Sequence, residues 1–238
     1  MGAAALGHHI PLSRVTRDVD LALVVAPQEI SGLLSSLGWR RDERLTHRWY
    51  GAAGFRADVL PATPELVTTG SVQLDRGEKV MSLVGFDLAL AHAATIVLDG
   101  TDADVKVASL PSLVLLKIVA WHDRPSERTK DLGDIALALI NALSEDDDRR
   151  WDRDDPIGAS GVQFDEQSPY FVGLELGRIA SEPHLIETRR FIDTMMETDT
   201  AAAAAMARAA DIRGEDPDEL MRRYVNAFAL GLQKGAQR

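Results

Sequence analysis

The chain has 238 residues, enough for one large domain or for a core with an appendage. A net charge of -11 argues against a surface that is basic throughout and coats nucleic acid. Cysteine is absent, which excludes disulfides, cysteine-based zinc sites and a thiol nucleophile. No apolar run approaches the ~20 residues that span a bilayer, and residues 1–10 lack the pattern of a signal peptide, so we expect a cytoplasmic protein without a membrane partner.

The chain begins with small residues at 2–9, which predict a short helix with a glycine near its end. His8 and His9 follow each other directly. Paired metal ligands on a helix would share one face, three or four residues apart. We therefore assign these two histidines no metal role.

Residues 18–25 alternate in the manner of a β-strand, with Asp18 and Asp20 on one face and apolar residues on the other. The two carboxylates project roughly 7 Å apart along such a strand, close enough to share a divalent cation. Many strands also begin with solvated acids. An Asp-x-Asp pair by itself therefore leaves both interpretations open.

A helix is predicted at 27–37, where apolar residues recur at helical spacing before Gly38, and two short strands are predicted at 39–44 and 47–50. Residues 55–60 alternate again, so Arg56, Asp58 and Leu60 share one face before prolines end the strand. If this strand pairs beside the first one, Asp58 comes alongside Asp18 and Asp20.

Residues 62–108 show no clear element until a strand at 105–108. A helix is then predicted at 109–121, and Lys117 lies within its apolar sequence. A lysine in this setting is more often a surface residue that extends its amine to water than a catalytic one. Both interpretations stay open from the pattern.

After a polar break at 124–130, Asp131 opens a helix that extends to residue 143, and it could serve simply as the cap. The charged segment 145–156 is interpreted as an exposed boundary. We therefore divide the chain into a catalytic core at 1–145 and a helical region at 157–238. The predicted helices of that region, which could pack within the chain or between chains, are 187–196, 201–210 and 217–232.

Five motifs in this order resemble the polymerase-beta-type nucleotidyltransferase superfamily and, within it, the AbiEii-like group, which includes toxins of type IV toxin–antitoxin systems. The resemblance covers residues 2 to about 143. It implies an α/β (α+β) fold with a small mixed sheet, helices packed on it and a helical C-terminal region. The motifs are residues 2–6, 14–21, 56–60, 115–121 and 128–135.

The resemblance also implies roles for individual residues. Asp18 and Asp20 match the pair that holds Mg²⁺ (or Mn²⁺) on the triphosphate of an NTP. Asp58 matches the third metal-binding carboxylate, which activates the attacking hydroxyl. Lys117 matches a helix lysine near the nucleotide phosphates. Asp131 matches a downstream catalytic acid, for which Asp134 is the near alternative.

Gly2, Arg14, Thr16 and Lys117 are the nucleotide-binding residues that the resemblance implies. Members of the superfamily usually carry an apolar strand that ends in Gly-Ser or Gly-Gly before the first helix. This sequence opens at Met1-Gly2-Ala3, so only Gly2 matches that dipeptide. The alternative is accordingly a catalytically degenerate domain that binds a nucleotide or a protein.

The implied activity is transfer of a nucleoside monophosphate from an NTP to an acceptor hydroxyl. The acceptor could be an RNA end such as that of tRNA, a protein or a small molecule. The negative net charge favours a small molecule over tRNA, because RNA binding usually needs a basic surface. The resemblance to toxins also implies an antitoxin.

Overall fold

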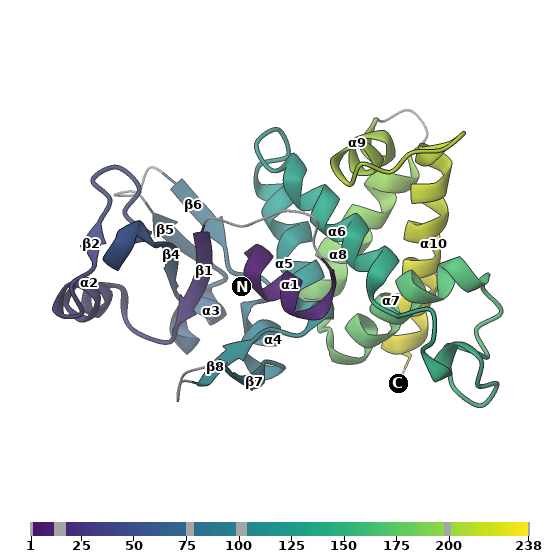
Figure 1. Ribbon diagram of the computed structural model, residues 1–238, viewed down its shortest axis with the longest axis horizontal. Coiled ribbons are helices and arrows are strands. Elements are labelled where there is room, and N and C mark those ends of the chain that lie inside the picture. Colours follow the sequence, from purple (N-terminus) through teal and green to yellow (C-terminus); the bar gives the residue numbers. More distant parts are fainter. Residues whose placement is uncertain (1, 12–17, 75–78, 99–103, 198–200, 238) are drawn as a thin grey trace. The chain divides into compact units, whose positions relative to one another are not determined.

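The structure is a computed structural model that describes residues 2–11, 18–74, 79–98, 104–197 and 201–237 (Figure 1). Within these ranges the chain forms two compact units. Unit 1 comprises residues up to 8 together with 12–109, and unit 2 comprises residues 9–11 and 110–238. Each unit has its own architecture.

Unit 1 contains a four-stranded mixed sheet with the strand order β1-β4-β3-β2. Strands β1 and β4 are parallel, whereas β3 runs antiparallel to both β4 and β2. Two antiparallel hairpins, β5–β6 and β7–β8, complete the strands that the structure describes here. The elements are α1 Gly2–His9, β1 Asp18–Leu23, α2 Pro27–Ser36, β2 Arg40–Arg41, β3 Arg48–Tyr50, η1 Ala52–Gly54, β4 Arg56–Pro61, α3 Pro64–Thr69, β5 Ser71–Leu74, β6 Lys79–Ser82, α4 Phe86–Ala91, β7 Ala94–Val97 and β8 Asp104–Val107.

The four-stranded sheet has one apolar face, and helix α2 packs on it. Ile30 and Leu34 of α2 form a core cluster with Trp49, Ala57 and Val59 of the strands. Because side chains alternate along a strand, the residues between these apolar ones point to the opposite face. The alternation predicted for 18–25 and 55–60 is thereby confirmed, and it directs the acidic residues away from the core.

The sequence showed no clear element in residues 62–108 before residue 105. The described residues of this range form two short helices and two antiparallel strand pairs. Helix α3 begins after Thr63, whose hydroxyl accepts the N–H of Leu66, and it ends at Gly70 in a left-handed conformation. The pairs β5–β6 and β7–β8 are only four residues long per strand. Such short elements leave little periodicity for a pattern to reveal.

Unit 2 is built from helices, with short 3₁₀ turns between some of them (Figure 1). Helix α6 carries a strongly apolar face, and α10 starts at Pro217 after Asp216, whose carboxylate accepts the N–H of Glu219. The elements are α5 Leu110–Asp123, α6 Thr129–Asn141, η3 Asp148–Arg150, η4 Phe164–Glu166, α7 Gln167–Ile179, α8 Glu182–Met196, α9 Ala202–Ala209 and α10 Pro217–Ala236.

Helices α7 and α10 lie side by side with their backbones in close contact (Figure 1). Gly173 and Gly177 of α7 face Gly231 and Gly235 of α10 at four-residue spacing. A Cβ atom on any of these glycines would overlap backbone atoms of the other helix. The α10 helix, for which packing within or between chains was left open, thus packs within the chain.

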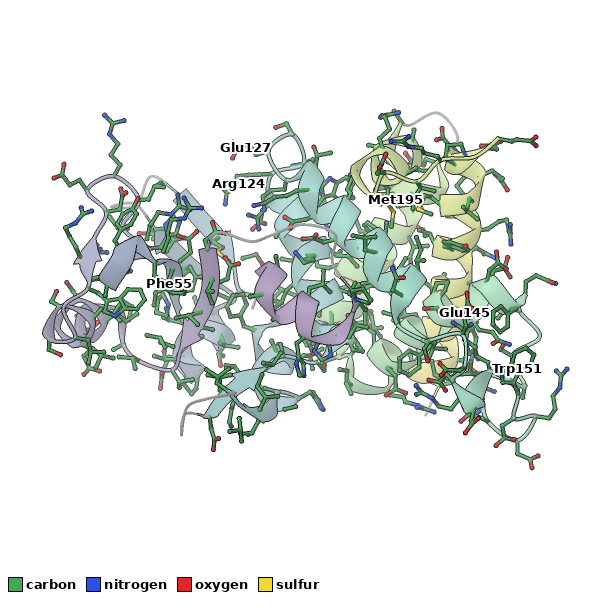
Figure 2. The ribbon with its side chains drawn as sticks, in the orientation of Figure 1. Phe55, Arg124, Glu127, Glu145, Trp151 and Met195 are labelled. Atoms are coloured by element: carbon green, nitrogen blue, oxygen red, sulfur yellow. The ribbon has the colours of Figure 1, made fainter. Side chains whose placement is uncertain are left out.

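The charged segment at 145–156 packs against the rest of unit 2 through Arg150, although its composition suggests an exposed segment. Glu145 and Trp151 are exposed (Figure 2), but the Arg150 side chain is buried and donates to three backbone carbonyls. Burial lowers the pKa of Arg150. The backbone carbonyls replace the water that its guanidinium loses. The accepting residues are Leu143, Ser144 and Phe164.

The fold class predicted from the sequence is confirmed: a small mixed sheet with helices packed on it precedes a helical C-terminal region. Apart from residues 9–11, which belong to unit 2, the division between the compact units falls between residues 109 and 110. This division reflects how densely the residues pack within each unit and does not test which residues are needed for catalysis. The boundaries of the catalytic core at 1–145 and of the helical region at 157–238 stay a prediction.

Candidate functional site

Three of the predicted site residues lie on the polar face of the four-stranded sheet. Strands β1 and β4 pair in parallel so that Asp20 is opposite Asp58 and Asp18 is opposite Arg56. Paired residues of neighbouring strands project to the same face. Asp18, Asp20 and Asp58 therefore share that face, as the sequence predicted from the alternation of the two strands.

Two arginines share this face with the acids. Arg48 of β3 pairs in register with Asp58, and Arg56 of β4 lies two residues before it. We call the group formed by these two arginines and the three aspartates the carboxylate face. Its members are Asp18, Asp20, Arg48, Arg56 and Asp58.

The Asp58 carboxylate is held by Arg48 through both of its oxygens. Arg48 donates from Nε to Oδ1 at 2.7 Å and from Nη2 to Oδ2 at 2.8 Å. The hydrogen bond to Asp58 raises the pKa of Arg48 above its usual range, although burial opposes this. A two-pronged ion pair of this kind fixes orientation as well as distance.

The Asp18 carboxylate is held differently. Arg56 donates to it from Nη2 alone, over 2.8 Å to Oδ2. The Nε atom of Arg56 is buried and finds no hydrogen-bond partner among the residues that the structure describes. The Arg56–Asp18 pair therefore has one hydrogen bond, whereas the Arg48–Asp58 pair has two.

Gly2 lies against the third acid of the face. A Cβ atom at Gly2 would overlap the Asp20 carboxylate, and Gly2 adopts a positive φ of 71° that favours glycine. The start of helix α1 thus approaches Asp20 in a way that other residues could not. The predicted nucleotide-binding residues Arg14 and Thr16 lie outside the described residues.

The other predicted site residues form a second cluster in unit 2. Lys117 of α5 is 7% exposed, and its Nζ lies 2.6 Å from Asp134 Oδ2 and 3.2 Å from Asp131 Oδ1. Arg128 Nε lies 2.7 Å from Asp131 Oδ2. We call Lys117, Arg128, Asp131 and Asp134 the lysine cluster.

The lysine cluster shows that Lys117 is a buried residue, whereas its catalytic role stays a prediction. The amine does not extend to water, because both acids at 131 and 134 lie one turn apart on α6 and face it. The predicted acid Asp131 and its near alternative Asp134 both contact the lysine. The turn between α5 and α6 carries a further ion pair, Arg124–Glu127 (Figure 2).

Sequence reasoning gave no site role to the two arginines of the carboxylate face. The signal for Arg56 was present, because it shares a strand face with Asp58. Arg48 carried no such signal, since its position opposite Asp58 depends on the antiparallel register of β3 and β4. Both arginines lie in strands shorter than seven residues, where several registers fit the same pattern.

The donor atoms of the carboxylate face suit a hard divalent cation. Mg²⁺ and Mn²⁺ prefer carboxylate oxygens, and the face carries three carboxylates against two guanidinium groups. Across the described ranges, no three acidic or imidazole side chains converge as a ready-made metal site.

Comparison with protein families finds one match that spans nearly the whole chain. Residues 2–228 match the family described as "Nucleotidyl transferase AbiEii toxin, Type IV TA system". Comparison with curated proteins and with solved structures finds no match. Among the described residues, no helix is both long and apolar enough to cross a membrane. The chain therefore belongs to the AbiEii family of nucleotidyl transferase toxins of type IV toxin–antitoxin systems.

Proposed function

We propose that the protein is a Mg²⁺- or Mn²⁺-dependent nucleotidyltransferase that transfers a nucleoside monophosphate from an NTP to an acceptor hydroxyl. The observation that supports this most directly is the register of β1 and β4, which puts Asp18, Asp20 and Asp58 on one sheet face. Family membership supports the reaction class and implies a nucleotide substrate and an antitoxin.

The chemistry requires a cluster of acids for a physical reason. The acceptor oxygen forms a bond to the α-phosphorus, the bond to the bridging oxygen breaks, and pyrophosphate leaves. A divalent cation, when bound, supplies positive charge for the attacking and leaving oxygens. Asp18 and Asp20 would hold it, while Asp58, which Arg48 orients, would accept the proton of the acceptor hydroxyl or bind a second cation.

Within unit 1, Gly2, Arg14 and Thr16 are the residues proposed to bind the nucleotide. For Lys117, the nucleotide-binding role stays a prediction from the resemblance. Gly2 opens helix α1 beside Asp20, and backbone N–H groups at a helix start suit phosphate oxygens. Lys117 and Asp131 are proposed catalytic residues in unit 2. Their ion pair would hold the lysine in one orientation.

The proposal is tested by calorimetry, in which each of the four NTPs is titrated with Mg²⁺ into the protein. We expect one NTP to bind, and the Asp18→Ala/Asp20→Ala variant to lose that binding while its circular dichroism is unchanged. Glu43→Ala is the matched control, because Glu43 is an exposed acid of unit 1 outside the carboxylate face. Binding that survives in the double variant would contradict the proposed site.

A transfer assay then identifies the acceptor class. The protein is incubated with the bound NTP, labelled at the α-phosphate, and with total RNA, total protein or a small-molecule extract in parallel. Label is expected in one of these fractions, and it should be absent with the double variant. Nucleotide binding without transfer to any fraction would favour the alternative of a degenerate binding module.

A further inference from the structure

The arginines of the carboxylate face supply the positive charge that its three acids require. Asp18, Asp20 and Asp58 lie at neighbouring positions of two paired strands, where carboxylates repel one another. Arg48 and Arg56 each donate hydrogen bonds to one of these acids. A divalent cation that binds on this face must therefore compete with a guanidinium group already present.

We propose that Arg56 is an exchangeable counter-cation: it holds Asp18 before a divalent cation binds, releases that carboxylate to the cation and then binds the triphosphate. The proposal rests on the proposed function, because it needs both ligands to bind on the carboxylate face. Arg56 lies in the family motif at 56–60, but the resemblance implied no role for it, and the proposal assigns it one in nucleotide binding.

The geometry of the two pairs distinguishes Arg56 from Arg48. Arg48 satisfies both oxygens of Asp58, and the two side chains are 21% and 16% exposed. Arg56 satisfies one oxygen of Asp18, and these side chains are 32% and 31% exposed. The pair with one hydrogen bond and more solvent access is the easier to separate.

The guanidinium of Arg56 also has unused hydrogen-bonding capacity. Its Nε is buried and has no partner among the described residues. A buried donor without a partner is unfavourable, so a rearrangement that satisfies this N–H would offset the loss of the Asp18 bond. Phosphate oxygens are strong acceptors with the geometry that a guanidinium binds in pairs.

Charge predicts the order of events. A divalent cation on Asp18 and Asp20 repels the guanidinium on the same carboxylate and thus releases Arg56. The released guanidinium then lies beside the cation, at the position where the triphosphate needs a second positive group. Removal of Arg56 should therefore have opposite effects on the two ligands: tighter binding of the cation alone and weaker binding of the cation–triphosphate complex.

The test measures two affinities of the full chain by calorimetry, that for Mn²⁺ alone and that for inorganic tripolyphosphate in excess Mn²⁺. For Arg56→Gln we expect about three- to tenfold tighter Mn²⁺ binding and at least about tenfold weaker tripolyphosphate binding. Tripolyphosphate is used because its binding does not depend on the nucleobase.

Arg40→Gln is the matched control. Arg40 is an exposed arginine on the same sheet, stacked over Tyr50 at 4.9 Å, and Tyr50 lies opposite Arg56 in the next strand. Two strand spacings, roughly 10 Å, separate it from Arg56. Arg40→Gln removes one positive charge, as Arg56→Gln does. Its affinities for Mn²⁺ and for tripolyphosphate should change by less than about twofold, because salt screens charges at this distance.

Arg56→Lys covers the case in which Arg56→Gln does not fold. It keeps the charge but loses the planar fork, so tripolyphosphate should bind more weakly than to the parent protein, and Mn²⁺ affinity should rise less than in Arg56→Gln. Mn²⁺ affinity that is unchanged or lower in both Arg56 variants would overturn the proposal. Tighter Mn²⁺ binding with unchanged tripolyphosphate binding would overturn its second half.

Failure of the proposed function gives a different result. In that case the Asp18→Ala/Asp20→Ala variant would bind Mn²⁺ with the same affinity as the parent protein. If Mn²⁺ binding depends on these two acids and Arg56 variants still match the parent, the site stands and the exchange by Arg56 is wrong.

Discussion

The carboxylate face and the lysine cluster use the same chemistry in different surroundings. Both join aspartates to basic side chains at hydrogen-bond distance. The carboxylate face lies on a sheet and is partly open to solvent, whereas Lys117, Asp131 and Asp134 are buried between helices. Water can replace a partner in the first group. In the second it cannot, so removal of one member leaves a buried charge.

This difference separates two kinds of contribution to function. A partly solvated ion pair can exchange its partner for a ligand at low free-energy cost, which suits a binding site. A buried network fixes the orientation of its members and is expected to position rather than exchange them. The comparison predicts which substitutions unfold the protein and which only alter binding.

The largest expected effect follows from removing one cation from each group. Lys117→Met should lower the free energy of unfolding by about 3–5 kcal/mol, because the buried Asp134 then faces an apolar side chain and Asp131 loses one of its two cationic neighbours. Arg48→Met should lower it by only about 1 kcal/mol, since water reaches Asp58. Urea denaturation of the full chain measures both values.

Lys130→Met is the control for that pair of variants. Lys130 is an exposed lysine on α6, so its replacement should change the free energy of unfolding by less than about 0.5 kcal/mol. Equal losses for Lys117→Met and Arg48→Met would break the comparison, because burial would then not distinguish the two groups.

A smaller effect is expected from two glycines that occupy helices of different units. Gly173→Ala should destabilise the protein by about 1–3 kcal/mol, since the added methyl group meets the Phe228 backbone of α10. Gly32→Ala in α2 has open space around it and should stabilise by roughly 0.5–1 kcal/mol. Thermal unfolding of each variant shows whether its stability is lower or higher than that of the parent protein. A stabilising Gly173→Ala would show that α7 and α10 are not in close contact.

The smallest effect is a pH dependence from His122 of α5, which lies 2.7 Å from Glu187 of α8. Burial lowers the pKa of His122, and the hydrogen bond to Glu187 only partly opposes this. The unfolded chain then binds more protons near the usual histidine pKa of about 6.5, so stability should fall as the pH drops through that value.

Unfolding measured at about pH 7.5 and about pH 5.5 tests this dependence. His122→Gln should show a smaller loss between the two values than the parent protein. An equal loss would mean that other groups account for the pH dependence, and that the buried histidine does not sense protons.

Much of the fold could be predicted from local pattern. The alternation at 18–25 and 55–60 placed the acids on one strand face, and the two strands do pair as expected. The helix around Lys117 and the one after Asp131 were also visible, because apolar residues recur at helical spacing. These features could be predicted because they depend only on residues that are close together in the sequence.

The sequence by itself therefore determined the fold class, the family motifs and the acids of the proposed site. Only the tertiary structure decided what those acids contact. Arg56 and Asp18 are 38 residues apart, and Arg48 meets Asp58 through the register of β3 and β4. The amine of Lys117 can be buried because two acids of the neighbouring helix α6 face it. Such pairings follow from packing, which no local periodicity encodes.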